Sequence, residues 1–141
     1  MKKNLLFYCF IIAAIISCSP KLSPDNDWGY KRWVLSDMKG VPVQQSGTRK
    51  DAYIEFSPND KKFTGNAGCN RMCGDYTLGK KDKIKFGEVI TTKMACADIN
   101  FETVFLSTLS TVDKFKVDNG NLLLKDNGDV VLVFVPQTAS R

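Results

Sequence analysis

Hydrophobic and polar positions alternate along most of the chain, which predicts a protein built mainly from short strands. The alternation is clear in residues 31–38, where Trp33 and Leu35 lie two positions apart, and in residues 52–56. Asn-Gly pairs at 119–120 and 127–128 are the strongest short hairpin signal. We therefore expect about eight short antiparallel strands, and the remaining extended segments are residues 62–66, 75–78, 83–87, 89–94, 114–117, 122–124 and 130–135.

The period of the hydrophobic positions changes after residue 98, where it becomes helical. Phe101, Phe105, Leu109 and Val112 fall on one face of such a helix. Either Asp98 or Asn100 can cap its start. One helix and an antiparallel sheet place the domain in the α+β class.

The first residues have the pattern of a signal peptide. Lys2 and Lys3 precede an apolar run from Leu5 to Ile16, which is too short to span a membrane comfortably. The run ends in Ile15-Ile16-Ser17-Cys18, which resembles the lipobox of bacterial lipoproteins. That resemblance implies cleavage before Cys18 and acylation of Cys18 by palmitate or a similar chain, so that membrane lipid is a partner. The alternative is an ordinary signal peptide with an incidental cysteine.

These features divide the chain into a signal peptide (1–17), a polar tether (18–27), a domain (28–136) and a frayed tail (137–141). Ser19 follows the lipobox cysteine, where Asp would favour retention in the inner membrane. We therefore expect a lipid-anchored cell-envelope protein, in the outer membrane rather than the inner one.

Composition removes several classes of function. Without residues 1–17, which include Lys2 and Lys3, the chain keeps 18 of its 20 basic residues against 15 acidic ones. The lysines are scattered among acidic residues along the sequence, so a nucleic-acid partner is not expected. The chain has no histidine, which excludes Ser-His-Asp and Cys-His triads within it and removes the commonest metal ligand. We expect no catalytic residue, no metal and no cofactor.

Two segments carry more local detail than solubility requires. In residues 63–76, Gly65, Gly68 and Gly74 interrupt a strand pattern, and each allows a positive φ or a close backbone approach. The amide of Asn70 can bond nearby backbone in such a corner, and Arg71 can have a similar role. The second segment is residues 92–96. The elements Gly68-Cys69-Asn70, Gly74-Asp75-Tyr76 and Thr92-Lys93-Met94-Ala95-Cys96 resemble the signature of the META domain, also called the HslJ-like family.

The resemblance covers Trp28 to Val135 and implies a sheet curved into a partial barrel, with the helix packed against its interior side. It also implies a disulfide between Cys69 and Cys96. Glu102 matches the family's helical glutamate, and a favourable interaction with the helix dipole is enough to explain an acid in a first turn. The residues expected to form the structural motif are Gly65, Gly68, Asn70, Gly74, Tyr76, Met94 and Glu102.

Cys73 departs from the family pattern and leaves other interpretations open. A Cys73–Cys96 bridge would close a loop of similar length to Cys69–Cys96. A redox enzyme would normally carry Cys-x-x-Cys at a helix start, but the spacing of Cys69 and Cys73 is longer. A zinc site would need a fourth ligand that histidine cannot supply here.

Three functions follow from these observations. The first is a non-catalytic envelope lipoprotein with a binding or stress-related role, and only the family resemblance supplies the stress association. Its partner would be an unknown protein or small molecule. The second is a carrier of a small hydrophobic ligand, and the third is a thiol–disulfide oxidoreductase that uses Cys73. Most aromatic residues are expected in the core, whereas Trp28 and Tyr30 lie outside the alternation and are candidates for an exposed partner surface.

Overall fold

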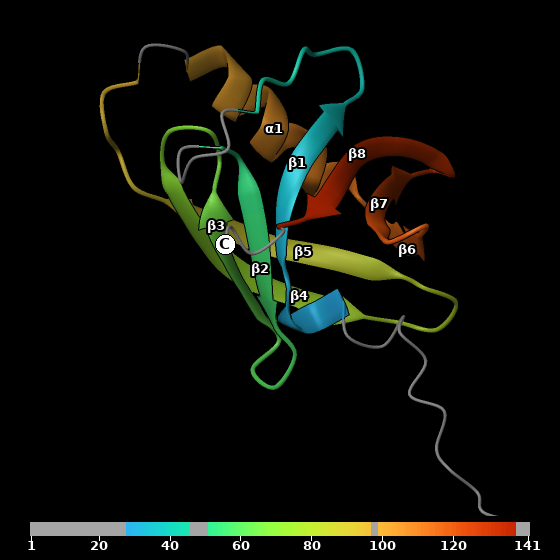
Figure 1. Ribbon diagram of the computed structural model, residues 1–141. Coiled ribbons are helices and arrows are strands. Elements are labelled where there is room, and N and C mark those ends of the chain that lie inside the picture. The colour runs from blue at the N-terminus through green and yellow to red at the C-terminus, as the bar shows by residue number, and fades with distance from the viewer. Residues whose placement is uncertain (1–27, 46–50, 97–98, 138–141) are drawn as a thin grey trace, which may run out of the picture.

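Eight antiparallel strands form one curled sheet in the order β5-β4-β3-β2-β1-β8-β7-β6 (Figure 1). The structure is a computed structural model that describes residues 28–45, 51–96 and 99–137. The single helix of the described residues is α1 (Ile99–Thr111). This architecture confirms the expected α+β partial barrel. The strands are β1 (Arg32–Met38), β2 (Tyr53–Ser57), β3 (Lys62–Asn66), β4 (Arg71–Leu78), β5 (Ile84–Thr91), β6 (Lys114–Asp118), β7 (Asn121–Asp126) and β8 (Asp129–Pro136).

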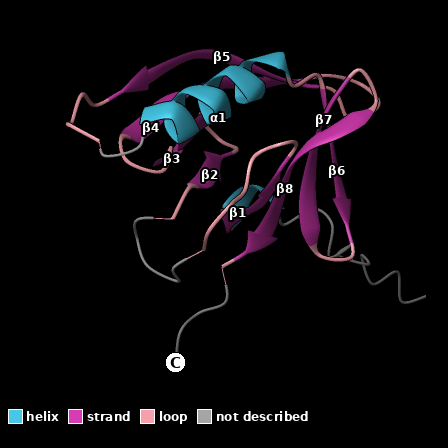
Figure 2. Cartoon of the chain, turned by 90° about the horizontal axis from the view of Figure 1, so that it is seen from above, coloured by secondary structure: helices cyan, strands magenta, loops and turns pink. Residues whose placement is uncertain are grey.

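The two edge strands of the sheet meet at one end and diverge at the other. Lys83 and Lys114 form a bridge between them, and the Phe115 amide donates to the Asp82 carbonyl oxygen at 2.9 Å. Where the edges diverge, α1 runs alongside β5 and also contacts β8 (Figure 2). The helix therefore fills the gap that would otherwise leave the sheet open.

The interior of this half-barrel is filled with side chains. Trp33, Leu35, Phe105, Leu109 and Phe134 are all at most 1% exposed, and they come from both the sheet and the helix. The expected apolar stripe of α1 is confirmed by the burial of Phe105 and Leu109. A packed core of this kind does not favour the carrier hypothesis, which requires a cavity inside the curved sheet.

The prediction that Trp28 is exposed is wrong. Trp28 opens a short 3₁₀ turn and packs its ring against Phe56 and Phe115, with centroid distances of 4.9 and 4.8 Å. Its carbonyl oxygen accepts a hydrogen bond from the indole nitrogen of Trp33 at 2.7 Å. Trp28 lies outside any strand, so alternation could not reveal its packing. Tyr30 remains exposed, at 67%.

Two strand boundaries also differ from expectation. Residues 71–74 were expected in a corner but form the start of β4, in which Cys73 pairs with Thr64 on one side and with Ile90 on the other. Residues 83–87 and 89–94 were expected as separate segments, but residues 84–91 form the single strand β5. Glycine weakens a strand but does not break it: Gly74 in β4 pairs with Phe63 and Val89, and the edge strand β5 continues through Gly87 with β4 as its ladder partner.

Candidate binding site at the disulfide corner

The glycines that interrupt the strand pattern each have a steric reason. A Cβ at Gly65 would collide with the carbonyl oxygen of Tyr53. At Gly74 a Cβ would lie 2.7 Å from the carbonyl oxygen of Glu88. Gly68 has a φ of 106° and lies against the ring of Phe101. Positive φ and close backbone approach are both tolerated here because glycine has no Cβ that would clash.

Asn70 joins three separate parts of the chain at this corner. It is 3% exposed and lies between β3 and β4. Its side-chain oxygen accepts hydrogen bonds from the Met94 amide at 2.7 Å and from the Thr92 hydroxyl at 2.9 Å. Its side-chain nitrogen donates to Glu102 in α1 at 2.9 Å. One amide thereby holds the 92–96 segment and the helix to the sheet.

Glu102 has a larger role than a first-turn acid beside the helix dipole. It is only 5% exposed, and its two oxygens accept from the backbone nitrogen of Asn70 at 2.8 Å and from the side-chain nitrogen of Asn70. A dipole interaction alone would not require burial, so the first interpretation was incomplete. A buried carboxylate is stabilised here by hydrogen bonds that satisfy both oxygens.

A disulfide joins Cys69 to Cys96 across 27 residues and covers this polar contact. The side-chain nitrogen of Asn70 lies 3.3 Å from the sulfur of Cys96. The two sulfurs and a Glu102 oxygen lie within 4.8 Å of one another, a grouping that could hold a metal ion if both thiols were free. In the disulfide form the sulfurs are bonded to each other, so only the carboxylate remains as a strong ligand.

Tyr76 and Met94, the other expected motif residues, lie in different environments. Tyr76 is 1% exposed and packs against Phe56, and its hydroxyl has no hydrogen-bond partner among the described residues. Burial raises the pKa of Tyr76 above its usual value. Met94 is 60% exposed, so its backbone amide, rather than its side chain, takes part in the corner.

An open groove of about 1030 Å³ adjoins the disulfide corner. Its apolar walls come from the segment after β1, from Met94 and from the first turns of α1, and they include Val41, Val43, Phe101 and Val104. A concave and largely apolar surface beside a few polar groups is typical of binding sites. Sequence reasoning missed the groove because its walls come from segments far apart in the chain.

Cys73 lies on the outer face of the sheet, within β4 rather than at the start of α1. It is free and exposed in the middle of β4, in a second open groove of about 650 Å³ lined also by Arg32, Tyr53 and Arg71. Most aromatic residues were expected in the core, but Tyr53 instead lines this outer groove. The Arg32 guanidinium lies 4.0 Å from the centroid of its ring. A thiol in the middle of a strand lacks the helix-start setting that activates redox cysteines.

Some expectations fall on residues that the structure does not describe. Cys18, the signal peptide, the tether and Asp98 lie outside the described residues, as does most of the expected tail. Asn100 is the second residue of α1 and therefore does not precede the helix as a cap. Among the described residues, no helix is long and apolar enough to cross a membrane.

The fold and the corner together define a small α+β half-barrel domain whose helix is held to the sheet by a buried Asn–Glu contact and a disulfide. The model of the META domain family matches residues 27–139, and the chain belongs to this family. The predicted family resemblance is confirmed.

Solved structures share this fold at low sequence identity. An NMR structure of a protein from Burkholderia xenovorans is 24% identical, with a TM-score of 0.65, and the match covers 85% of this chain and 95% of that one. A DUF4847 family protein from Bacteroides vulgatus is 15% identical, with a TM-score of 0.58, covering 82% and 98%. At these identities the likeness shows the fold alone. A search of curated proteins found no match.

Proposed function

We propose that the protein is a non-catalytic lipoprotein of the cell envelope that acts by binding a protein or small molecule. The observation that carries the envelope assignment is the Cys69–Cys96 disulfide, because structural disulfides persist in oxidising compartments outside the cytoplasm. The sequence Ile15-Ile16-Ser17-Cys18 after an apolar run supports the anchor. A stress-related role is part of the proposal only through the family resemblance.

Several observations favour binding over catalysis. The chain has no histidine, and the buried carboxylate of Glu102 is occupied by Asn70. The free thiol of Cys73 lies between strand neighbours rather than beside a second cysteine. The groove beside the disulfide corner offers a concave apolar surface instead.

The anchor is tested by labelling cells with palmitate. The wild-type protein should incorporate label, and Cys18→Ala should remain an unlabelled, unprocessed precursor. A wild-type protein that is cleaved elsewhere and recovered without label would contradict the anchor.

The binding surface is tested by placing a photoreactive amino acid at Met94, on the rim of the groove. Ile90 is the matched control, because it is a similarly exposed apolar side chain (65% against 60%) on the outer face of the sheet. Irradiation of intact cells should give a discrete adduct from position 94 and none from position 90. Equal adducts from both positions, or none from either, would contradict a binding role for the groove.

A further inference from the structure

Seven lysines gather at the end of the half-barrel where the chain enters the domain. Three contacts place them together. Gly29 lies against Pro58 of the β2–β3 turn, and the Tyr76 amide donates to the Lys61 carbonyl oxygen at 2.8 Å. The backbones of Lys83 and Lys114 form an antiparallel β-bridge. Figure 1 shows the 3₁₀ turn at the start of the domain between the β2–β3 and β4–β5 turns. We call this region the lysine end, and its lysines are Lys61, Lys62, Lys80, Lys81, Lys83, Lys85 and Lys114.

The lysine end carries the whole positive excess of the chain that follows the signal peptide. All seven lysines are exposed, and the aspartates near them are Asp60, Asp75, Asp82 and Asp113, of which the last precedes Lys114 and accepts, through its carbonyl oxygen, a hydrogen bond from the Ile84 amide. The rest of the chain from residue 18 has eleven basic and eleven acidic residues. The seven lysines form no ion pair within the described part of the chain. Such a patch attracts anionic partners.

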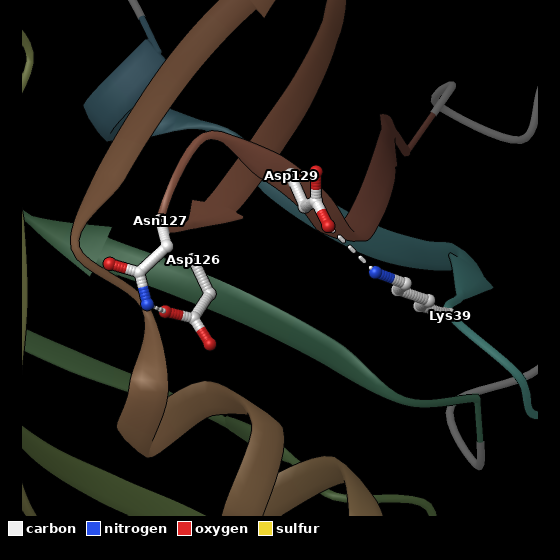
Figure 3. Close-up of polar contacts among 4 residues, drawn as sticks. All are labelled: Lys39, Asp126, Asn127 and Asp129. Atoms are coloured by element: carbon white, nitrogen blue, oxygen red, sulfur yellow. Dashed lines mark hydrogen bonds and ion pairs between the residues drawn. The ribbon is translucent and has the colours of Figure 1, made fainter.

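Lys39, beyond the other end of β1, shows the contrasting arrangement. Its ammonium group lies 2.9 Å from a carboxylate oxygen of Asp129. Figure 3 shows the two side chains pointing toward each other. This hydrogen bond raises the pKa of Lys39 and lowers the pKa of Asp129. The charge of Lys39 is thus paired with a carboxylate, although both side chains are exposed, whereas the lysine end has no such ion pair among the described residues.

The backbone at the lysine end adds an independent observation. Lys61 and Lys81 have φ values of 56° and 58°, in the left-handed region where glycine and asparagine are easier to accommodate. The β6–β7 and β7–β8 hairpins place Asn119 and Asn127, respectively, in the same left-handed conformation. Lysine at strained turn positions points to a use for its charge rather than to the needs of the turn.

We propose that the lysine end docks on the anionic lipid headgroups of the bilayer that holds the Cys18 anchor, an inference that rests on the proposed lipoprotein. Trp28 follows Cys18 by ten residues, so the tether spans at most about 35 Å. Such a tether holds the lysine end at an effective concentration of the order of millimolar, at which weak contacts suffice. Tyr30 and Leu78 are exposed at this end, 67% and 42%, and tyrosine is favoured at the headgroup level of membranes.

Docking in this way would orient the groove away from the membrane. Strands β1, β3 and β4 each run between the lysine end and the disulfide corner, so the two regions lie at opposite ends of these strands. The groove would then face a partner in the compartment rather than the bilayer.

Docking is tested with the chain from residue 18 carrying Cys18→Ser, since the described fold lies within residues 28–137. This unlipidated protein should float with vesicles of phosphatidylcholine and phosphatidylglycerol, but not with phosphatidylcholine alone, and added salt should release it. The variant Lys80→Gln/Lys81→Gln/Lys83→Gln should bind about tenfold to a hundredfold more weakly. The control Lys39→Gln/Arg71→Gln/Lys93→Gln loses the same charge elsewhere and should bind within about twofold of the parent.

Orientation is tested with an environment-sensitive fluorophore on a single cysteine in a Cys73→Ser background. Tyr30→Cys should give a blue shift when anionic vesicles are added, and Ile99→Cys on α1 should not. Equal losses from both triple variants, equal shifts at both labels, or binding to a soluble acidic polymer but not to vesicles would each overturn the proposal. Palmitate labelling is a separate readout, so failure of the anchor and failure of docking are distinguishable.

Discussion

The disulfide corner and the lysine end are both places where strands turn, but different interactions hold them. At the disulfide corner the polar groups point inward: Asn70 and Glu102 are buried, hydrogen-bonded to each other and covered by the Cys69–Cys96 bridge. At the lysine end, aromatic packing around Trp28 forms the structure and the charged groups point outward. Polar residues at the first end therefore serve the fold, whereas those at the second are available for recognition.

Loss of the disulfide should have the largest effect on stability. The double variant Cys69→Ser/Cys96→Ser should lose about 3.5 kcal/mol of unfolding free energy, the loop-entropy value for this span. Urea unfolding monitored by circular dichroism measures it. The control Cys73→Ser should unfold like the wild type, and an equal loss in that control would contradict the structural assignment of the bridge.

The next largest effect should come from the buried carboxylate. Glu102→Ala leaves the backbone and side-chain donors of Asn70 without their acceptor, which should cost about 2 kcal/mol. Thr103→Ala removes an exposed neighbour in the same helix and should change the free energy of unfolding by less than about 0.5 kcal/mol. If the two variants were equally stable, the Asn70–Glu102 contact would not hold the helix to the sheet.

Tyr76, which is buried near the lysine end, should have the opposite effect: removing its hydroxyl should raise the stability of the fold. Because its hydroxyl lacks a partner among the described residues, Tyr76→Phe should stabilise the protein by about 1 kcal/mol at neutral pH. Burial raises the pKa of Tyr76 in the folded state. Its contribution to stability is therefore fully present below the unfolded-state pKa of about 10 and is lost as the pH rises above that value.

Alkaline unfolding measures this contribution. Tyr76→Phe should lose less stability than the wild type between neutral pH and pH values above about 10. The same alkaline loss in wild type and Tyr76→Phe would show that another group causes it.

The smallest effect separates charge from backbone strain at the lysine end. Lys81→Asn should stabilise the fold by up to about 1 kcal/mol, because asparagine tolerates the left-handed conformation better. The same change should weaken vesicle binding. Lys80→Asn, one residue earlier, should weaken binding to a similar degree without added stability. Stronger vesicle binding by Lys81→Asn would show that the turn, rather than its charge, makes the contact.

Much of the fold was predictable because its signals are local. Alternation identified the strands around Trp33 and Ile54, the helical period identified α1, and the Asn-Gly pairs identified both hairpins. The failures were also informative. Residues 71–74 lie within β4 because β3 and β5 pair with them, and Gly87 lies within the edge strand β5, which pairs with β4; local propensity does not contain that information.

The sequence by itself determined the α+β class, the family and the residue types of the corner, because hydrophobic periodicity and glycine chemistry act between near neighbours. Only the tertiary structure decided that Glu102 is buried against Asn70, that Trp28 packs against the core and that a groove adjoins the disulfide. It also decided that seven lysines share one end. In the sequence these lysines are spread over more than fifty positions with acidic residues between them. Strand register brings distant turns together by pairing residues that are far apart along the chain.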